Sequence, residues 1–215
     1  MIVCHNPHIE IHNKDFLHYS SIIPDESIAM IIFDITCDKN LQEMTDPVVF
    51  SYMYSTIFKR IIKPNGVILV FGTGLLYHYF IITNKDIFRY EIIWNKQSLT
   101  NIFTVNQQFG ITHEHIAIFY KQQPYYKKIP YKEYNYIPSI LQYIPDKTHK
   151  KPITLLEHLI TIFTLPQDII LDCCCQTGYT LIACKITQRQ GIGFEKDYSL
   201  YTQAIAYIKE TNVLF

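Results

Sequence analysis

Apolar residues along this chain come in short, nearly continuous runs, and longer segments with the apolar period of a helix lie between them. In the run Ser27–Phe33 almost every position is apolar, which is typical of a strand buried on both faces of a parallel sheet. Six further segments are strand-like. The seven predicted strands are Ile9–His12, Ser27–Phe33, Val67–Phe71, Phe88–Trp94, Glu114–Tyr120, Ile169–Leu171 and Gly191–Phe194.

The segments between these strands predict helices. In Val48–Ile62 the apolar residues recur on one face, and the sequence Lys63-Pro-Asn-Gly66 ends the pattern. The other predicted helices are Leu75–Thr83, Pro152–Phe163, a segment that begins at Thr180, and Ser199–Lys209. Strands that alternate with helices predict an α/β fold with one doubly wound, mostly parallel sheet of seven strands. No internal repeat or clear linker interrupts the pattern, so we expect a single domain over residues 1–215.

The stretch Asp168–Asp197 has the pattern of a strand, a loop, a helix and a second strand, which is long enough for one right-handed crossover. Its first strand ends at Asp172, its loop contains Gly178, and its second strand ends at Glu195. An acid about twenty residues beyond the loop is where a nucleoside-binding unit needs an acceptor for ribose hydroxyls. The alternative is that both acids only cap a loop and a helix of an ordinary α/β protein.

A second acid is placed for chemistry at the end of a strand. Asp34 follows the apolar run Ser27–Phe33, and side chains just beyond the carboxyl ends of parallel strands line the ligand crevice of such sheets. An aspartate that only caps a turn or a helix is the alternative at this position.

The composition indicates a packed protein without overall charge. The hydrophobic share of 48% supports a core, and Lys+Arg equal Asp+Glu at 19 each, so any affinity for nucleic acid must come from a local patch. No apolar run approaches the ~20 residues that cross a membrane, and the first residues lack the layout of a secretion signal. We therefore expect an intracellular protein that does not enter membranes.

Two groups of potential metal ligands occur in the sequence, and neither has the spacing of a metal site. The consecutive Cys173–Cys175 cannot give the spacing of a Cys-x2-Cys zinc site, and His113 and His115 flank Glu114 without a third ligand nearby. We expect no metal, and we expect the six cysteines to be reduced.

Residues 121–151 differ in composition from the rest of the chain. They are rich in Lys, Tyr and Pro, and Glu133 and Asp146 are their only acids. Ammonium groups attract phosphates and aromatic rings stack on bases, so this segment is a candidate nucleic-acid surface. The candidate contacts are Lys121, Lys127, Lys128 and Lys132. A solvated loop in a chain biased towards Lys and Tyr is the alternative.

The order of these segments resembles that of the beta-arrangement DNA amino-methyltransferases, in which the catalytic segment precedes the S-adenosylmethionine-binding segment. Asp34-Ile-Thr-Cys37 falls where that family has Asp-Pro-Pro-Tyr, the loop Asp172–Thr180 resembles Asp-Pro-Phe-x-Gly-Ser-Gly-Thr-Thr, and Gly191–Glu195 resembles the ribose-binding segment. The other matching segments are Asn13–Leu17, Pro24–Ser27, Lys63–Gly66, Ile92–Lys96, His113-Glu114 and Lys151–Ile160. The resemblance implies a Rossmann-like methyltransferase fold with circularly permuted motif order. It places a catalytic half at 8–120, a short recognition insert at 121–150 and a cofactor half at 151–210.

The resemblance also implies roles for single residues. In the catalytic segment Asp34, Ile35, Thr36 and Cys37, Asp34 would accept a hydrogen bond from the amino group of an extruded base, and the carbonyl of Ile35 would hold its other hydrogen. Glu195 would bind the ribose of S-adenosylmethionine, and Asp15 would bind its adenine. The residues expected near the methionine part are Asp172, Cys173, Gln176, Gly178 and Thr180.

The departures from the family fall on these working residues. Cys37 replaces the ring that would stack on the base, an interaction worth roughly 1–3 kcal/mol, and Phe33 or a nearby Tyr is the candidate substitute. Gln176 replaces the first glycine of the loop, which is unfavourable if the backbone there needs positive φ.

Two functions therefore stay open. The first is a divergent S-adenosylmethionine-dependent DNA methyltransferase that modifies the exocyclic amino group of adenine or cytosine, and the retained acids favour it. The second is a catalytically inactive protein of the same fold that binds nucleic acid or serves as a partner subunit, and the lost proline, aromatic and glycine residues favour it. DNA is the expected partner in the first case, and a homodimer or a complex with another subunit is open in both.

Overall fold

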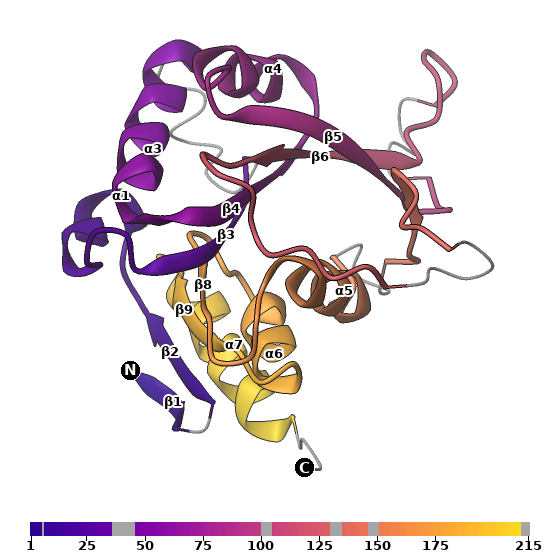
Figure 1. Ribbon diagram of the computed structural model, residues 1–215. Helices are drawn as coiled ribbons and strands as arrows, with labels where there is room; N and C mark the ends of the chain where they lie inside the picture. Colours follow the sequence, from indigo (N-terminus) through magenta and orange to yellow (C-terminus); the bar gives the residue numbers. More distant parts are fainter. Residues whose placement is uncertain (6, 36–45, 100–104, 130–134, 146–150, 212–215) are drawn as a thin grey trace.

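A mixed sheet runs through the protein and carries helices on both faces (Figure 1). The structure is a computed structural model that describes residues 1–215 apart from 6, 36–45, 100–104, 130–134, 146–150 and 212–215. The described residues form nine strands in the order β1-β2-β9-β8-β3-β4-β6-β5-β7. They are β1 (Ile2–His5), β2 (His8–His12), β3 (Ile28–Asp34), β4 (Ile62–Gly72), β5 (Phe88–Asn95), β6 (His113–Phe119), β7 (Ile140–Gln142), β8 (Ile169–Asp172) and β9 (Gln190–Phe194).

The centre of the sheet is parallel. The strands β2, β9, β8, β3 and β4 pair in parallel, so their carboxyl ends lie at one edge of the sheet, which we call the carboxyl edge. The opposite edge is the amino edge. Strand β6 runs antiparallel between β4 and β5, and β5 pairs in parallel with β7. Strands β5 and β7 therefore also end at the carboxyl edge, and β6 begins there.

The α/β fold is confirmed, and all seven predicted strands belong to this sheet. Strands β1 and β7 add to the seven. They have four and three residues, which is too short for an apolar period to stand out from the sequence.

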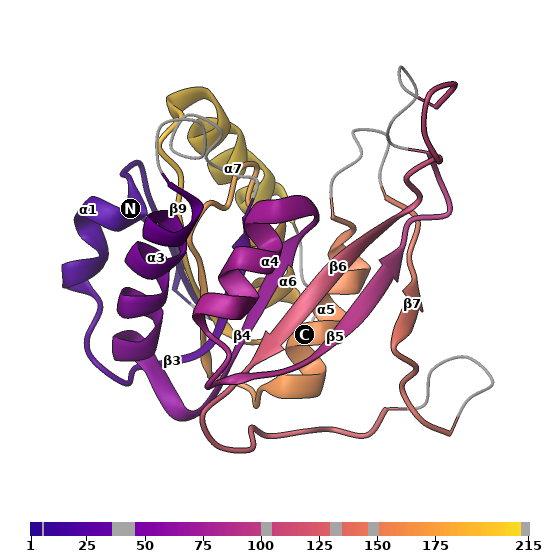
Figure 2. The ribbon, with the colours of Figure 1, turned by 90° about the horizontal axis from the view of Figure 1, so that it is seen from above.

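Two groups of helices cover opposite faces of the sheet (Figures 1 and 2). On β3, Met30 and Ile32 pack towards one group while Ile31 and Phe33 pack towards the other, so every residue from Ile28 to Phe33 is buried. Burial on both faces explains why this run of the sequence is continuously apolar. One face carries α1 (Phe16–Tyr19), α3 (Pro47–Ile61) and α4 (Gly74–Thr83), and the other carries α5 (Ile153–Phe163), α6 (Tyr179–Ile186) and α7 (Tyr198–Glu210).

The predicted helices correspond to α3–α7, and α3 shows why their ends were readable. The Asp46 carboxylate accepts hydrogen bonds from the backbone N–H groups of Val48 (2.8 Å) and Val49 (3.3 Å), and Pro47 occupies the first turn. The helix ends at Ile61 because β4 begins at the next residue. Over the described ranges, no helix has the length and apolar character that crossing a bilayer requires.

Aromatic rings fill the space between β3 and the helices α3 and α4. The Phe33 ring lies with its centroid 4.4 Å from that of Tyr54, 5.4 Å from Phe58 and 5.9 Å from Phe80. Because Phe33 has no exposed surface, its ring is part of the core on the α3 side.

We predict that Phe33→Ala lowers the free energy of unfolding by about 3–5 kcal/mol, because it removes a fully buried ring and leaves a cavity. Urea denaturation measures this. Tyr52→Ala is the control, since Tyr52 lies on the outer face of α3 with 65% of its surface exposed and should cost less than about 0.5 kcal/mol. Equal losses in the two variants would contradict the prediction.

Candidate active site

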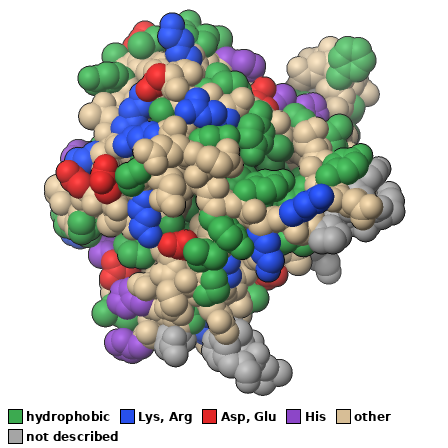
Figure 3. Space-filling model, viewed as in Figure 1, with side chains coloured by type: hydrophobic (Ala, Val, Ile, Leu, Met, Phe, Trp, Pro, Cys, Tyr) green, Lys and Arg blue, Asp and Glu red, His purple; other side chains and the backbone are tan. Residues whose placement is uncertain are grey.

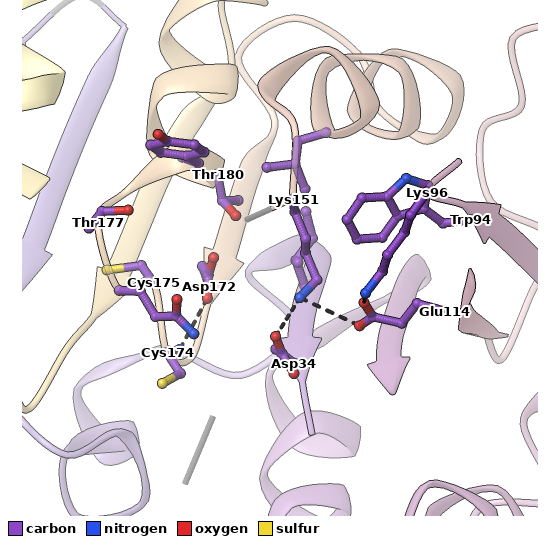
Figure 4. A pocket seen from close by; sticks show the side chains of 14 residues that line it. Asp34, Trp94, Lys96, Glu114, Lys151, Asp172, Cys174, Cys175, Thr177 and Thr180 are labelled. Carbon is purple, nitrogen blue, oxygen red and sulfur yellow. Dashed lines mark hydrogen bonds and ion pairs between the residues drawn. The ribbon is translucent and has the colours of Figure 1, made fainter. Parts of the chain in front are cut away.

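Carboxylates end or follow three neighbouring parallel strands at the carboxyl edge. Asp34 ends β3, Asp172 ends β8, and Glu195 follows β9. Because β3 and β8 are neighbouring parallel strands, Asp34 and Asp172 line the same cavity, which has a volume of about 370 Å³ (Figure 4). This size is typical of a small-molecule site, and parallel sheets bind ligands outside the carboxyl ends of their strands.

A chain of alternating charges forms one wall of the cavity (Figure 4). Lys151, just before α5, donates to the Asp34 carboxylate, and its Nζ lies 3.7 Å from Oε1 of Glu114 on β6. Oε2 of Glu114 lies 2.9 Å from Nζ of Lys96, which follows β5. The four side chains are only 12–18% exposed. Charges so far from water are tolerated only when they are paired, as these are.

Lys151 is the centre of this chain. Burial alone would lower the pKa of Lys151, but the attraction of Asp34 and Glu114 outweighs it and holds the pKa above its ordinary value. The ammonium group is therefore charged near neutral pH, and it favours the ionised form of Asp34.

Asp172 is the more deeply buried carboxylate, with 7% of its surface exposed. Burial raises the pKa of Asp172 to about 6, although hydrogen bonds from Thr180 and from the backbone N–H of Cys174 and the charge of Lys151 oppose the rise. The Cys174 bond is 3.0 Å long. Near neutral pH this side chain is an anion that the protein solvates poorly, which suits a cationic ligand.

The loop between β8 and α6 turns through two residues with positive φ. Gly178 has φ +79° and begins α6, and Gln176 has φ +46°. A residue other than glycine in this region is strained by about 1 kcal/mol or more. Position 176 therefore does need positive φ, the conformation in which a glutamine is unfavourable. The side chain of Gln176 also lines the cavity. Thr180 lines the same cavity.

Glu195 fixes this loop. Its Oε2 accepts from the backbone N–H of Gln176 (2.9 Å), and its Oε1 accepts from that of Asp197 (2.8 Å). Burial raises the pKa of Glu195, which is 4% exposed, while these two hydrogen bonds oppose the rise. The carboxylate thus ties the end of β9 to the loop that follows β8.

A smaller hollow adjoins the main cavity, because Cys174 lines both. It is lined by Asp15, Cys173 and the ring of Phe194, with Lys14 and Lys196 at its rim. Its volume of about 20 Å³ holds little more than one water molecule, so a planar ring that enters must displace side chains. One oxygen of Asp15 already accepts from the backbone N–H of Leu17 (2.9 Å) as the cap of α1.

The segment expected to carry catalysis is only partly within the described residues. Asp34 lines the cavity, and Ile35 is buried with its N–H donating to the carbonyl of Phe71 (3.0 Å). Thr36 and Cys37 lie outside the described residues. The suggestion that Phe33 replaces the missing stacking ring is wrong, because Phe33 points into the core on the α3 side. Trp94 and Tyr179 are aromatic residues that do line the cavity.

Three of the lysines expected to contact nucleic acid, Lys121, Lys127 and Lys128, do not line this cavity. Nζ of Lys121 donates to the carbonyl of Lys59 (2.8 Å) near the end of α3, and the N–H of Lys127 donates to that of Ile162 (2.8 Å) near the end of α5. Both helices end at the amino edge, so Lys121 and Lys127 lie at the edge of the sheet opposite the cavity. Lys128 is exposed on the same segment, and Lys132 lies outside the described residues.

Sequence reasoning did not select Lys151, Glu114 and Lys96 as site residues, although they fell in matching segments. The alternation of side chains along a strand could have indicated Glu114. In His113-Glu114-His115 the glutamate faces the cavity, whereas His115 faces the α4 side, where its Nδ1 lies 3.5 Å from Oε1 of Glu91. Among the described residues, no group of three or more His, Cys, Asp or Glu side chains is placed to hold a metal ion.

Comparison with known proteins gives a family match over most of the chain. Residues 38–206 match the model of the N6/N4 methyltransferase family, described as DNA methylase. The Type II methyltransferase M.HindIII of Haemophilus influenzae is 38% identical over 56 residues. That match spans 26% of this chain and only 18% of the relative.

Solved structures share the fold along nearly the whole chain. The PvuII DNA methyltransferase, described as cytosine-N4-specific, superposes with a TM-score of 0.80 at 18% identity, covering 96% of this chain and 88% of that one. The M1.HpyAVI–SAM complex superposes at 0.69 with 21% identity, covering 93% and 98%. TTHA0409 of Thermus thermophilus, a putative DNA modification methylase complexed with S-adenosyl-L-methionine, superposes at 0.67 with 19% identity, covering 95% and 99%.

The buried charge of Asp172 predicts a gain in stability on its removal. A carboxyl group whose pKa is about 6 when folded and ordinary when unfolded costs stability above pH 6, and this cost vanishes below about pH 4. We predict that Asp172→Asn raises the free energy of unfolding by roughly 3 kcal/mol near neutral pH and by little near pH 4. Urea denaturation at the two pH values measures the difference, and a gain of equal size at both would contradict it.

Proposed function

Because this chain belongs to the N6/N4 DNA methylase family, we propose that it transfers a methyl group from S-adenosylmethionine to the exocyclic amino group of adenine or cytosine in DNA. One observation carries the proposal: Asp34 and Asp172, from opposite halves of the sequence, line one cavity. A methyl donor held near Asp172 and an amino group held by Asp34 can therefore meet. We assign the catalytic part to residues 8–120 and the cofactor part to 151–210.

The cofactor residues of the proposal lie along a continuous path. Asp15 lines the small hollow, Glu195 lies next to it, and Asp172, Gln176 and Thr180 line the main cavity. The hollow would hold the adenine ring, Glu195 the ribose and the loop the methionine part. When bound, S-adenosylmethionine supplies a methyl group on a positively charged sulfur. The anionic side chains of Asp172 and Asp34 in a poorly solvated cavity suit that charge.

Asp34 would orient the amino group of the base. An ionised carboxylate accepts a hydrogen bond from the amino N–H, and this turns the nitrogen lone pair towards the methyl carbon. Bound S-adenosylmethionine would supply the methyl carbon, so that a nitrogen–carbon bond would form as the carbon–sulfur bond breaks and its electrons stay on sulfur. The nitrogen then loses one proton, which passes by way of Asp34 to water. Lys151 would keep Asp34 ionised and fixed, and Glu114 with Lys96 would keep Lys151 in place.

A second function has one observation in its favour. The side chain of Gln176 lines the cavity, where a glycine would leave more room, and this opposes cofactor binding. If the cofactor does not bind, the remaining function is that of an inactive methyltransferase-fold protein that binds nucleic acid or a partner subunit.

Cofactor binding separates the two functions. We predict saturable heat on titration of the protein with S-adenosylmethionine, about tenfold weaker binding for Glu195→Gln, and severalfold tighter binding for Gln176→Gly, which removes a side chain from the cavity wall. Isothermal titration calorimetry measures all three. The absence of binding in the natural protein and in Gln176→Gly at millimolar cofactor would leave only the second function.

Methyl transfer depends on the pair Asp34–Lys151. We predict that Asp34→Ala lowers incorporation of labelled methyl groups into DNA by about 100-fold or more while cofactor affinity changes little. Lys151→Met should lower the rate about tenfold. It should also shift the acidic limb of the pH–rate profile to higher pH, because Asp34 is protonated more readily without the ammonium group. Lys151→Arg should restore most of the rate. Lys63→Met is the matched control, because it breaks a lysine–aspartate pair of 3.0 Å (with Asp168) at the amino edge. Activity that persists in Asp34→Ala would refute the assigned role.

A further inference from the structure

A second cavity opens on the α5 side of the sheet, between the first half of β5 and the end of α5. Its volume is about 350 Å³, close to that of the main cavity. The wall is mostly apolar and includes Tyr90 and Ile92 of β5, Tyr120 and Tyr126 beyond β6, and Leu159 and Phe163 of α5. We call it the tyrosine cavity. Protein interiors leave few voids larger than a water molecule, so an open apolar cavity of this size indicates a ligand site rather than loose packing.

Two of the tyrosines present ring surface to a ligand. Tyr90 is 39% exposed and Tyr126 is 46% exposed, although both line the cavity. The ring of Tyr126 packs at a steep angle against that of Phe163, with the centroids 5.9 Å apart. Burial raises the pKa of Tyr90 to about 12, and the nearby Tyr120 and Tyr126 add to the rise, so its hydroxyl group is neutral and can donate. Such rings suit a flat aromatic group with polar edges, such as a nucleobase.

Four cationic side chains border the tyrosine cavity. The guanidinium group of Arg89 lies over the ring of Tyr120, with its Cζ 5.0 Å from the centroid, and it donates to the carbonyl of Lys121 (3.2 Å). Lys127 and Lys128 are exposed where the chain reaches the end of α5. In the part of the chain that the structure describes, no Asp or Glu forms an ion pair with these four cations. Figure 3 shows Lys and Arg side chains beside hydrophobic ones over the segment that follows β6. The surroundings therefore favour a ligand that carries negative charge.

The cations lie on two sides of the cavity. Arg89 and Lys121 stand where β6 ends, whereas Lys127 and Lys128 stand at the end of α5. A free nucleotide carries its phosphates on one side of its base, but a nucleic-acid strand has a phosphate on either side of each base. The arrangement therefore suits a strand whose backbone crosses the mouth of the cavity while one unpaired base enters it.

The mouth of the tyrosine cavity is remote from the main cavity. Tyr90 lies near the start of β5, and Asn95 ends this strand at the carboxyl edge. Eight residues at about 3.3 Å each place the two edges roughly 25 Å apart. A strand held at the amino edge is therefore a different stretch of nucleic acid from one that reaches Asp34.

We propose that the tyrosine cavity binds single-stranded nucleic acid, with one unpaired base stacked against Tyr90 and Tyr126. The cations on the two sides of the cavity hold the flanking phosphates. This inference does not rest on methyl transfer, since it uses neither the main cavity nor the cofactor.

The first experiment measures the binding of a fluorescein-labelled oligothymidylate by anisotropy at low salt, without cofactor. Tyr90→Ala should weaken binding about tenfold or more, because a stacked base loses its ring, whereas Tyr90→Phe keeps the ring and should stay within about threefold. Tyr207→Ala on α7 is the matched control and should change nothing, since Tyr207 is 40% exposed and Tyr90 is 39% exposed. No binding by the natural protein, or equal binding by Tyr90→Ala, would overturn the proposal.

The second experiment tests the cations and leaves the apolar wall intact, so it also covers the case in which Tyr90→Ala does not fold. The double variant Lys127→Gln, Lys128→Gln should bind more weakly. The slope of log affinity against log salt should become shallower by about 1.4, because each phosphate contact on a single strand contributes about 0.7. Lys209→Gln, which removes an exposed lysine of α7, should leave the slope unchanged. An unchanged slope in the double variant would overturn the phosphate contacts.

Competition separates the remaining occupants. Thymidine monophosphate and a duplex should displace the labelled strand about tenfold less well, or worse, than the unlabelled strand does. Equal displacement by the monophosphate would overturn the strand and assign the cavity to a free nucleotide. Equal displacement by the duplex would overturn the requirement for an unpaired base.

Methyl incorporation into duplex DNA separates this site from the proposed function. Tyr90→Ala should leave incorporation within about twofold of the natural protein, because the ring lies roughly 25 Å from the carboxyl edge. A parallel loss of strand binding and methyl incorporation would overturn the separate site. Strand binding that depends on Tyr90, in a protein that methylates no DNA, would refute the proposed function and leave the tyrosine cavity as assigned.

Discussion

The ammonium group of Lys151 is the interaction on which the arrangement at the carboxyl edge depends. Parallel packing of β3 and β8 forces Asp34 and Asp172 into one poorly solvated cavity, where two carboxylates repel each other and neither is well hydrated. Lys151 lies close enough to attract both, and Glu114 and Lys96 continue the alternation of charge across β6 to β5. Removing one member of such a chain leaves a buried charge without its partner, which is the costly outcome for a protein interior.

The two halves of the candidate site obtain their rigidity differently. Asp34 stands at the end of a strand that is buried on both faces, so its backbone is fixed by packing. The loop after Asp172 has two residues in the left-handed region and is fixed by the hydrogen bond from the backbone N–H of Gln176 to the buried carboxylate of Glu195. The strain at Gln176 is thus opposed by a charge-assisted hydrogen bond at the same residue, which is the usual way a strained backbone persists at a functional site.

The sequence predicts most of the fold because the sheet is buried on both faces. A continuous apolar run such as Ile28–Phe33 is readily identified as a buried strand. The acids at the ends of β3, β8 and β9 can then be located, because they come directly after such runs. The ion chain could not be predicted in this way, since its members are 34, 96, 114 and 151 in the sequence and meet only through the strand order. Composition marked residues 121–151 as basic, but the antiparallel direction of β6 places Lys121 and Lys127 at the amino edge, whereas Lys151 at the end of the segment lines the main cavity. Direction, unlike burial, leaves no trace in a local pattern.

The reversed strand β6 has a consequence for how such a protein can diversify. Since β5 and β6 meet at the carboxyl edge through the Lys96–Thr112 hydrogen bond, everything outside that bond can be lengthened, shortened or exchanged without disturbing a rung of the sheet or a wall of the cavity. Insertions directly after β6 enter the chain at the amino edge, on the side of the sheet opposite the main cavity. Length and sequence can therefore vary in the connection between β5 and β6 while the pairing of these strands and the wall of the main cavity stay as they are.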